Sequence, residues 1–180
     1  MNNQIVMQML TECSVELNHI RDLINVLGEH ALSTPYVKKY AVIRASGSIE
    51  IGFKTIIADR VDKDSHQQLK NFVARKIRKS SANPKLEKIE ELLNEFDENW
   101  QKRFKESIAL SDKPTLKNAL TKLVDTRNSF AHGGSAGLEI NDTIVFFNHG
   151  CEVLRLLDES IHEGVEPPET AGVAGIPELD

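Results

Sequence analysis

Apolar side chains recur every three or four residues along most of the sequence, and this spacing limits what the chain can fold into. The N-terminal segment shows it most clearly, with apolar residues at Ile5, Met9, Cys13, Leu17, Ile20, Ile24 and Leu27. Steps of three and four residues return to one face of a helix with 3.6 residues per turn. The spacing therefore predicts an amphipathic helix that ends near Gly28.

Five further segments share this pattern and are separated by turn residues. Helices are predicted over residues 34–60, 69–77, 86–104, from 116 to the pair Gly133 and Gly134, and over 142–162. The clearest loop between them covers residues 80–84. Because no segment shows the alternating pattern of a half-buried strand, the predicted fold class is all-α, a single bundle of about five to six helices.

The chain has the size and composition of one globular domain. Its 180 residues are 40% hydrophobic and 27% charged, which allows a buried core of ordinary size. We expect a helical domain over residues 1–163 and an acidic tail over 164–180, whose Pro and Gly content predicts disorder.

Neither the apolar segments nor the cysteines indicate a membrane or a secreted protein. No stretch approaches the roughly 18 uninterrupted apolar residues of a membrane span, and the first residues carry no targeting signal. Cys13 and Cys151 lie far apart and match neither a zinc ribbon nor a disulfide framework. We therefore expect a cytoplasmic protein with reduced thiols and no membrane association.

Charge is distributed unevenly along the chain. The net charge of -5 argues against a generic nucleic-acid binder. Residues 61–135 nevertheless carry 15 basic and 11 acidic side chains, whereas residues 136–180 carry 1 and 10. The middle of the chain is therefore basic and its end acidic.

The string RNSFAHGG, at residues 127–134, places several reactive side chains at the predicted end of a helix. Arg127 follows the stripe of Leu116, Leu120 and Leu123, so its guanidinium needs a partner, a groove or an interface. Asn128 and His132 are four residues apart and face the same way. This spacing allows the amide to orient the imidazole.

Arg127 and His132 do not face the same way. They are five residues apart, which is about 140° around an ideal helix. Two alternatives remain: the helix unwinds at the histidine, for which Gly133 and Gly134 are a common stop signal, or a second chain completes the site.

This string, together with Glu50 and Lys54 in an E-x-x-x-K on an earlier helix, resembles the HEPN superfamily and most closely its RiboL-PSP-HEPN branch. The resemblance covers about residues 5–162. It implies a metal-independent endoribonuclease without a cofactor. Such enzymes are homodimers in which two of these motifs meet in one composite site.

The resemblance also implies roles for individual residues. His132 would act as general base or acid, Arg127 would clamp the phosphoryl oxygens, and Asn128 would orient the site. Glu50 would pair with Arg127 or polarise it, unless it forms only a surface ion pair with Lys54. The remaining histidines show no spacing typical of metal ligands, so no metal site is predicted.

A basic cluster is the other candidate binding site. It comprises Lys70, Arg75, Lys76, Arg78, Lys79, Lys85 and Lys88. Arg75, Lys76, Arg78 and Lys79 are the residues predicted to contact RNA if the cluster flanks the cleft. A solvated surface is the alternative, because acidic residues interleave after Pro84 and the sequence shows no aromatic platform beside the cluster.

Three functions remain open on the sequence. The first is a ribonuclease toxin or antiviral defence effector that cuts RNA and has an antitoxin or another defence-system protein as a partner. The second is a catalytically inactive HEPN module for dimerisation or partner binding. The third is a helical-bundle adaptor unrelated to the family.

Overall fold

The computed structural model describes residues 1–63, 65–132, 134 and 137–162. These residues form seven α-helices, one π-helical segment and no strand, which confirms the all-α fold class. The elements are α1 (Gln4–Leu27), α2 (Thr34–Asp62), α3 (Gln67–Val73), η1 (Ala74–Arg78), α4 (Leu86–Phe96), α5 (Glu98–Leu110), α6 (Lys113–Ala131) and α7 (Ile140–His162). The acidic tail predicted over 164–180 lies outside the described residues.

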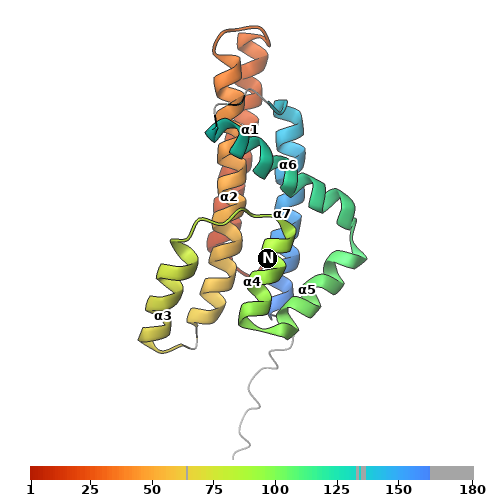
Figure 1. Ribbon diagram of the computed structural model, residues 1–180. Coiled ribbons are helices and arrows are strands. Elements are labelled where there is room, and N and C mark those ends of the chain that lie inside the picture. Colours follow the sequence, from red (N-terminus) through yellow and green to blue (C-terminus); the bar gives the residue numbers. More distant parts are fainter. Residues whose placement is uncertain (64, 133, 135–136, 163–180) are drawn as a thin grey trace, which may run out of the picture.

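The core is built around α2. This helix contacts α1, α6 and α7, and its C-terminal half also contacts α3 and η1. Figure 1 shows α1 and α2 side by side along the length of the molecule, with α7 next to them. The largest fully buried side chains include Phe53, Phe104 and Phe147, from α2, α5 and α7 respectively. The periodic apolar residues therefore meet in one shared core, as their spacing predicts.

Helix α1 ends where the sequence predicts. Gly28 has a φ of 89°, and its N–H donates to the carbonyl of Ile24 at 2.8 Å. Glycine adopts this positive φ without the steric cost that a side chain brings. The chain then turns and returns as α2.

A single helix over residues 86–104 is wrong, because the chain breaks at Asp97. This residue has an extended backbone, with φ -160° and ψ 116°. Its carboxylate accepts hydrogen bonds from the N–H groups of Asn99 at 2.7 Å and Trp100 at 3.3 Å, so it caps a new helix. As a result α5 folds back beside α4 and packs on α7 (Figure 1).

The helix predicted over 69–77 changes character partway along. Helix α3 continues directly into η1, a π-helical segment with a wider turn. Val73 and Ile77 pack with Ala58 of α2 in a small second cluster. This contact fixes the basic end of η1 next to α2.

Candidate active site

Helix α6 delivers Arg127 to the surface of the core. Its apolar stripe is buried as predicted, with Leu116, Leu120 and Leu123 at most 3% exposed. Asp112 caps the helix start by accepting from the N–H of Thr115. The next position along the stripe toward the C-terminus is Arg127, whose side chain is 21% exposed.

Arg127 connects three segments of the chain. Its Nη1 lies 2.9 Å from Glu50 Oε2 on α2. Its Nη2 donates to the side-chain oxygen of Asn83, in the loop after η1, and to that of Asn128 at 3.4 Å. The pairing of Arg127 with Glu50 is therefore present, and α6 is tied to both α2 and the loop.

Glu50 has two further partners on its other oxygen. Oε1 accepts from Lys54 Nζ at 3.0 Å and from the N–H of Ala82 at 2.9 Å. Lys54 also donates to the carbonyl of Ser80 at 2.7 Å. Because the side chains of Glu50 and Lys54 are only 12% and 8% exposed, their ion pair is a buried one and not a surface pair.

The surroundings of Glu50 set its charge. Burial alone raises the pKa of this carboxyl, but the Ala82 N–H, the Lys54 ammonium and the Arg127 guanidinium together outweigh burial and lower the pKa below its ordinary value. Glu50 therefore stays ionised at neutral pH. One negative and two positive side chains leave this cluster with a net positive charge, which favours an anionic ligand.

Asn128 does not orient His132 in the described structure. Its side-chain oxygen accepts from Arg127, and among the described residues positions 128 and 132 are joined by a backbone bond, from the His132 N–H to the Asn128 carbonyl at 3.3 Å. His132 is exposed, and its imidazole has no hydrogen bond among the described residues. The ring is thus accessible to a substrate or to another chain.

Helix α6 stops at the residue before His132. His132 has φ -100° and ψ 19°, outside the regular helix, and the N–H of Gly134 donates to the carbonyl of Ser129 at 2.8 Å. This last bond is the long-range one of a Schellman-type helix end. The helix therefore ends at the motif, which was one of the two alternatives for separating Arg127 from His132.

Gly134 is required for this helix end. A Cβ at position 134 would overlap the Ser129 hydroxyl and lie 2.9 Å from the Ser129 carbonyl oxygen. We expect Gly134→Ala to lower the free energy of unfolding by about 1 kcal/mol or more, since the terminal hydrogen bond is lost. Urea denaturation of the wild type and of Gly134→Ala measures this change in the free energy of unfolding.

Gly47→Ala is the matched control, because a Cβ there has no neighbour within 4 Å. It should leave stability unchanged or raise it by up to about 1 kcal/mol, as alanine favours helix. Equal effects of the two substitutions would show that the Ser129 contact does not constrain the helix end.

The predicted RNA-binding cations fall into two groups. Arg78 lies 2.7 Å from Asp59 and 2.8 Å from Asp62, and this double ion pair attaches η1 to α2. Arg75, Lys76 and Lys79 are exposed, and the described part of the chain offers them no ion pair. RNA binding by these residues stays a prediction, with the three exposed cations as its best candidates.

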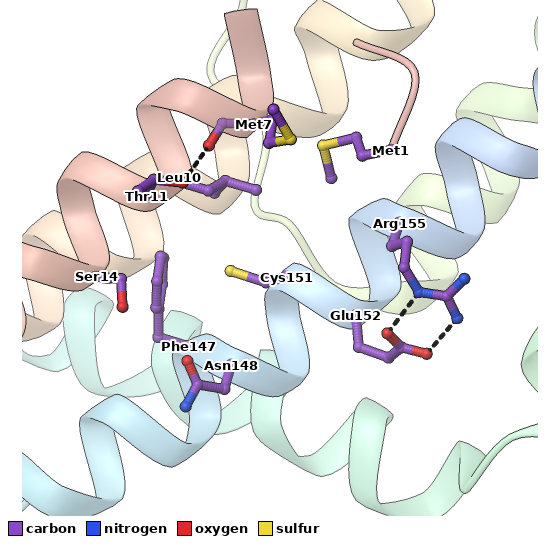
Figure 2. Close-up of a pocket in the computed structure, with 10 residues that line it drawn as sticks. All are labelled: Met1, Met7, Leu10, Thr11, Ser14, Phe147, Asn148, Cys151, Glu152 and Arg155. Atoms are coloured by element: carbon purple, nitrogen blue, oxygen red, sulfur yellow. Dashed lines mark hydrogen bonds and ion pairs between the residues drawn. The ribbon is translucent and has the colours of Figure 1, made fainter. Parts of the chain in front are cut away.

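A separate hollow of about 360 Å³ lies between α1 and α7, away from Arg127. Figure 2 shows Met1, Met7 and Cys151 pointing toward one another there, with the Glu152–Arg155 ion pair at the rim. Burial raises the pKa of the Cys151 thiol to about 12, so the thiol is protonated and a poor nucleophile. None of its lining residues takes part in the Arg127 network.

The described residues offer neither a metal site nor a membrane-spanning helix. They contain no group of three or more His, Cys, Asp and Glu side chains placed to hold a metal ion. Among the same residues, no helix combines the length and apolar character needed to cross a membrane.

The fold and the motif at the end of α6 define a HEPN-type helical module. The chain belongs to the RiboL-PSP-HEPN family, whose model matches residues 10–163. This confirms the resemblance, and modules of this type are often ribonucleases. No curated protein and no solved structure matches the chain.

The loop between η1 and α4 belongs to the site, and the sequence did not predict this. The loop supplies Asn83, the Ala82 N–H and the Ser80 carbonyl to the Arg127 network. The sequence marks these residues as a turn, but no spacing in it links them to a helix some 44 positions away.

Proposed function

We propose that the protein is a metal-independent endoribonuclease of the HEPN type that acts as a toxin or defence effector. The observation that carries this proposal is the arrangement at the end of α6. A fixed guanidinium, Arg127, sits in a cluster of net positive charge, and an exposed imidazole, His132, lies one turn further along. The pair supplies the two functions that metal-free RNA cleavage requires.

The reaction proceeds through the RNA's own 2′-hydroxyl. His132 accepts the proton of this hydroxyl, the 2′-oxygen forms a bond to phosphorus, and the bond to the 5′-oxygen breaks. The departing 5′-oxygen takes a proton from a second imidazole. The products are a 2′,3′-cyclic phosphate and a 5′-hydroxyl, and no co-reactant is consumed.

Arg127 stabilises the charge that develops on the phosphoryl oxygens. Of its five N–H donors, three already serve Glu50, Asn83 and Asn128. Two N–H donors, on Nε and Nη1, therefore remain for phosphate oxygens. The bond to Asn128 is the longest at 3.4 Å, so it is the contact expected to open first if the phosphate takes a third donor.

A second copy of the chain would supply the second imidazole. Helix α2 exposes Tyr36, Tyr40, Ile43 and Ile51 in one stripe. These large side chains are 73%, 49%, 49% and 51% exposed respectively. Steps of three and four residues continue this stripe into Glu50 and Lys54, so a partner on it would lie beside the Arg127 cluster.

We expect Ile43→Glu to convert a dimer into monomers and to remove RNA cleavage at the same time. A carboxylate in the centre of an apolar interface has no compensating partner. Sedimentation velocity measures the oligomeric state. Leu110→Glu, which changes a side chain that is 91% exposed at the end of α5, is the control and should stay dimeric and active.

A monomeric wild-type protein that cleaves RNA would contradict the composite site. So would an Ile43→Glu variant that remains dimeric. In either case the catalytic groups would have to come from one chain.

A catalytically inactive module is the second candidate. It is favoured by the contacts of Arg127 with Glu50 and Asn83, which tie α6 to α2 and to the loop after η1, as expected of an arginine that holds elements together. In this case Arg127→Ala would destabilise the bundle, and neither the wild type nor the variant would cut RNA.

The experiment that separates the two candidates compares RNA with DNA of the same sequence in the presence of EDTA. The enzyme proposal expects cleavage of the RNA only, with 2′,3′-cyclic phosphate ends. Intact RNA, or cleavage of both polymers, would contradict it. The toxin role predicts growth arrest when the wild-type protein is expressed and normal growth with His132→Ala.

A further inference from the structure

A cavity of about 520 Å³ adjoins the Arg127 cluster and has no role so far. It is lined by side chains of α2, α3, η1, the following loop and α4. Its volume lies within the range of small-molecule sites, which is roughly 300–1,000 Å³. The cavity is therefore large enough for a nucleotide.

Aromatic side chains from three helices line this cavity. Phe53 of α2 is fully buried, Phe96 of α4 is partly buried, and Phe72 of α3 is 54% exposed. The sequence predicts no aromatic platform beside the basic cluster. At this cavity one ring, Phe72, is nevertheless exposed, and exposed aromatic rings stack on nucleobases.

Cations accompany the exposed ring. Lys76 lines the cavity and also a shallower neighbouring hollow of about 430 Å³, which Phe72 and Arg75 line as well. Within the described residues neither Lys76 nor Arg75 has an ion pair. The two hollows therefore meet at one aromatic ring with two available positive charges, the combination that binds single-stranded nucleic acid.

The cavity shares a wall with the candidate active site. Lys54 lines it and bonds to Glu50, and Ala82 lines it and donates to the same carboxylate. The next loop residue, Asn83, holds Arg127. An RNA strand in the cavity would thus contact residues that belong to the Arg127 network or adjoin it.

We propose that this cavity is a subsite for single-stranded RNA, which stacks a base of a nucleotide next to the cleaved bond on Phe72. The adjoining phosphate would lie against Lys76 and Arg75. Glu95, the acid at the wall on α4, repels phosphate and accepts N–H groups from the base edge instead. This proposal rests on the ribonuclease function and names where its substrate binds.

Binding is tested in the His132→Ala background, so that RNA stays intact, by fluorescence anisotropy with a labelled single-stranded RNA. Phe72→Ala should weaken binding about tenfold, because one stacked base is lost, whereas Phe72→Trp should bind at least as tightly. Lys76→Ala should weaken binding and lower the slope of log K against log salt by about 0.7. Leu69→Ala is the control, since Leu69 is exposed on the same helix and lines neither hollow.

Binding by Phe72→Ala within twofold of the parent would overturn the subsite, as would a parent protein that does not bind single-stranded RNA. Different results would contradict the subsite and the ribonuclease function. If wild-type protein cleaves RNA and Phe72→Ala binds normally, the subsite alone is wrong. If Phe72→Ala weakens binding but the wild type does not cleave, the subsite stands and the enzyme proposal fails.

Discussion

Replacing His132 with alanine is expected to lower RNA cleavage by about 10²-fold or more and to leave the helical bundle folded. The imidazole moves a proton in the proposed reaction, and alanine cannot do so. Because the ring is exposed and has no hydrogen bond among the described residues, its removal should change the free energy of unfolding by no more than about 0.5 kcal/mol.

His30→Ala is the matched control for this substitution. His30 is also exposed and lies in the turn after α1, outside the Arg127 network. Cleavage rates and urea denaturation curves are measured for both variants. Equal cleavage by wild type and His132→Ala would assign the activity to a contaminant or to another group.

Replacing Glu50 with alanine is expected to lower the free energy of unfolding by about 3 kcal/mol, a cost typical of breaking a buried ion pair. Lys54 and Arg127 lose their carboxylate, and the Ala82 N–H loses its acceptor. Lys54 is only 6% exposed, and its ammonium would retain only the hydrogen bond to the Ser80 carbonyl. Urea denaturation of the purified protein measures the change.

Glu152→Ala is the control for Glu50→Ala. Glu152 pairs with Arg155 on α7, but these side chains are 40% and 41% exposed, and exposed pairs contribute less than about 1 kcal/mol. A Glu50→Ala variant no less stable than Glu152→Ala would show that the network contributes little to the fold.

The contribution of Glu50 should also disappear in acid. Burial raises its pKa, but the Ala82 N–H, Lys54 and Arg127 lower it further, so the folded pKa lies below the unfolded one. The stabilisation is therefore complete above the ordinary pKa of glutamate, about 4.3, and is lost as pH falls through the folded pKa. The difference in stability between wild type and Glu50→Gln should accordingly shrink below about pH 4.

Helical spacing was sufficient to predict most of the fold. The stop at Gly28 and the buried stripe of α6 follow from local patterns that tertiary packing did not override. The break at Asp97 could not be predicted in this way, because the apolar spacing continues through it and neither Gly nor Pro marks it. There a side-chain cap decides the structure, and the aspartate resembles any other charged surface residue in the sequence.

The candidate site was predicted only in part, for a different physical reason. Local spacing locates Arg127 and His132 at a helix end, but it cannot show which distant groups satisfy a guanidinium. Glu50 is 77 residues from Arg127, and the amide of Asn83 approaches it from a loop. The same limit applies to Phe72, whose place in a cavity depends on how α3 packs beside α2.

The single carboxylate of Glu50 receives donors from three separate segments, and this has a consequence for how related sequences can diverge. Loss of the carboxylate leaves two cations and a loop N–H without an acceptor, so it is tolerated only with compensating changes at positions 54 and 127. We expect these three positions to change together among relatives of this fold. In a relative that keeps arginine and histidine at the end of α6 but lacks the acid on α2, the arginine side chain would take a different position. The motif alone would then be a poor guide to activity.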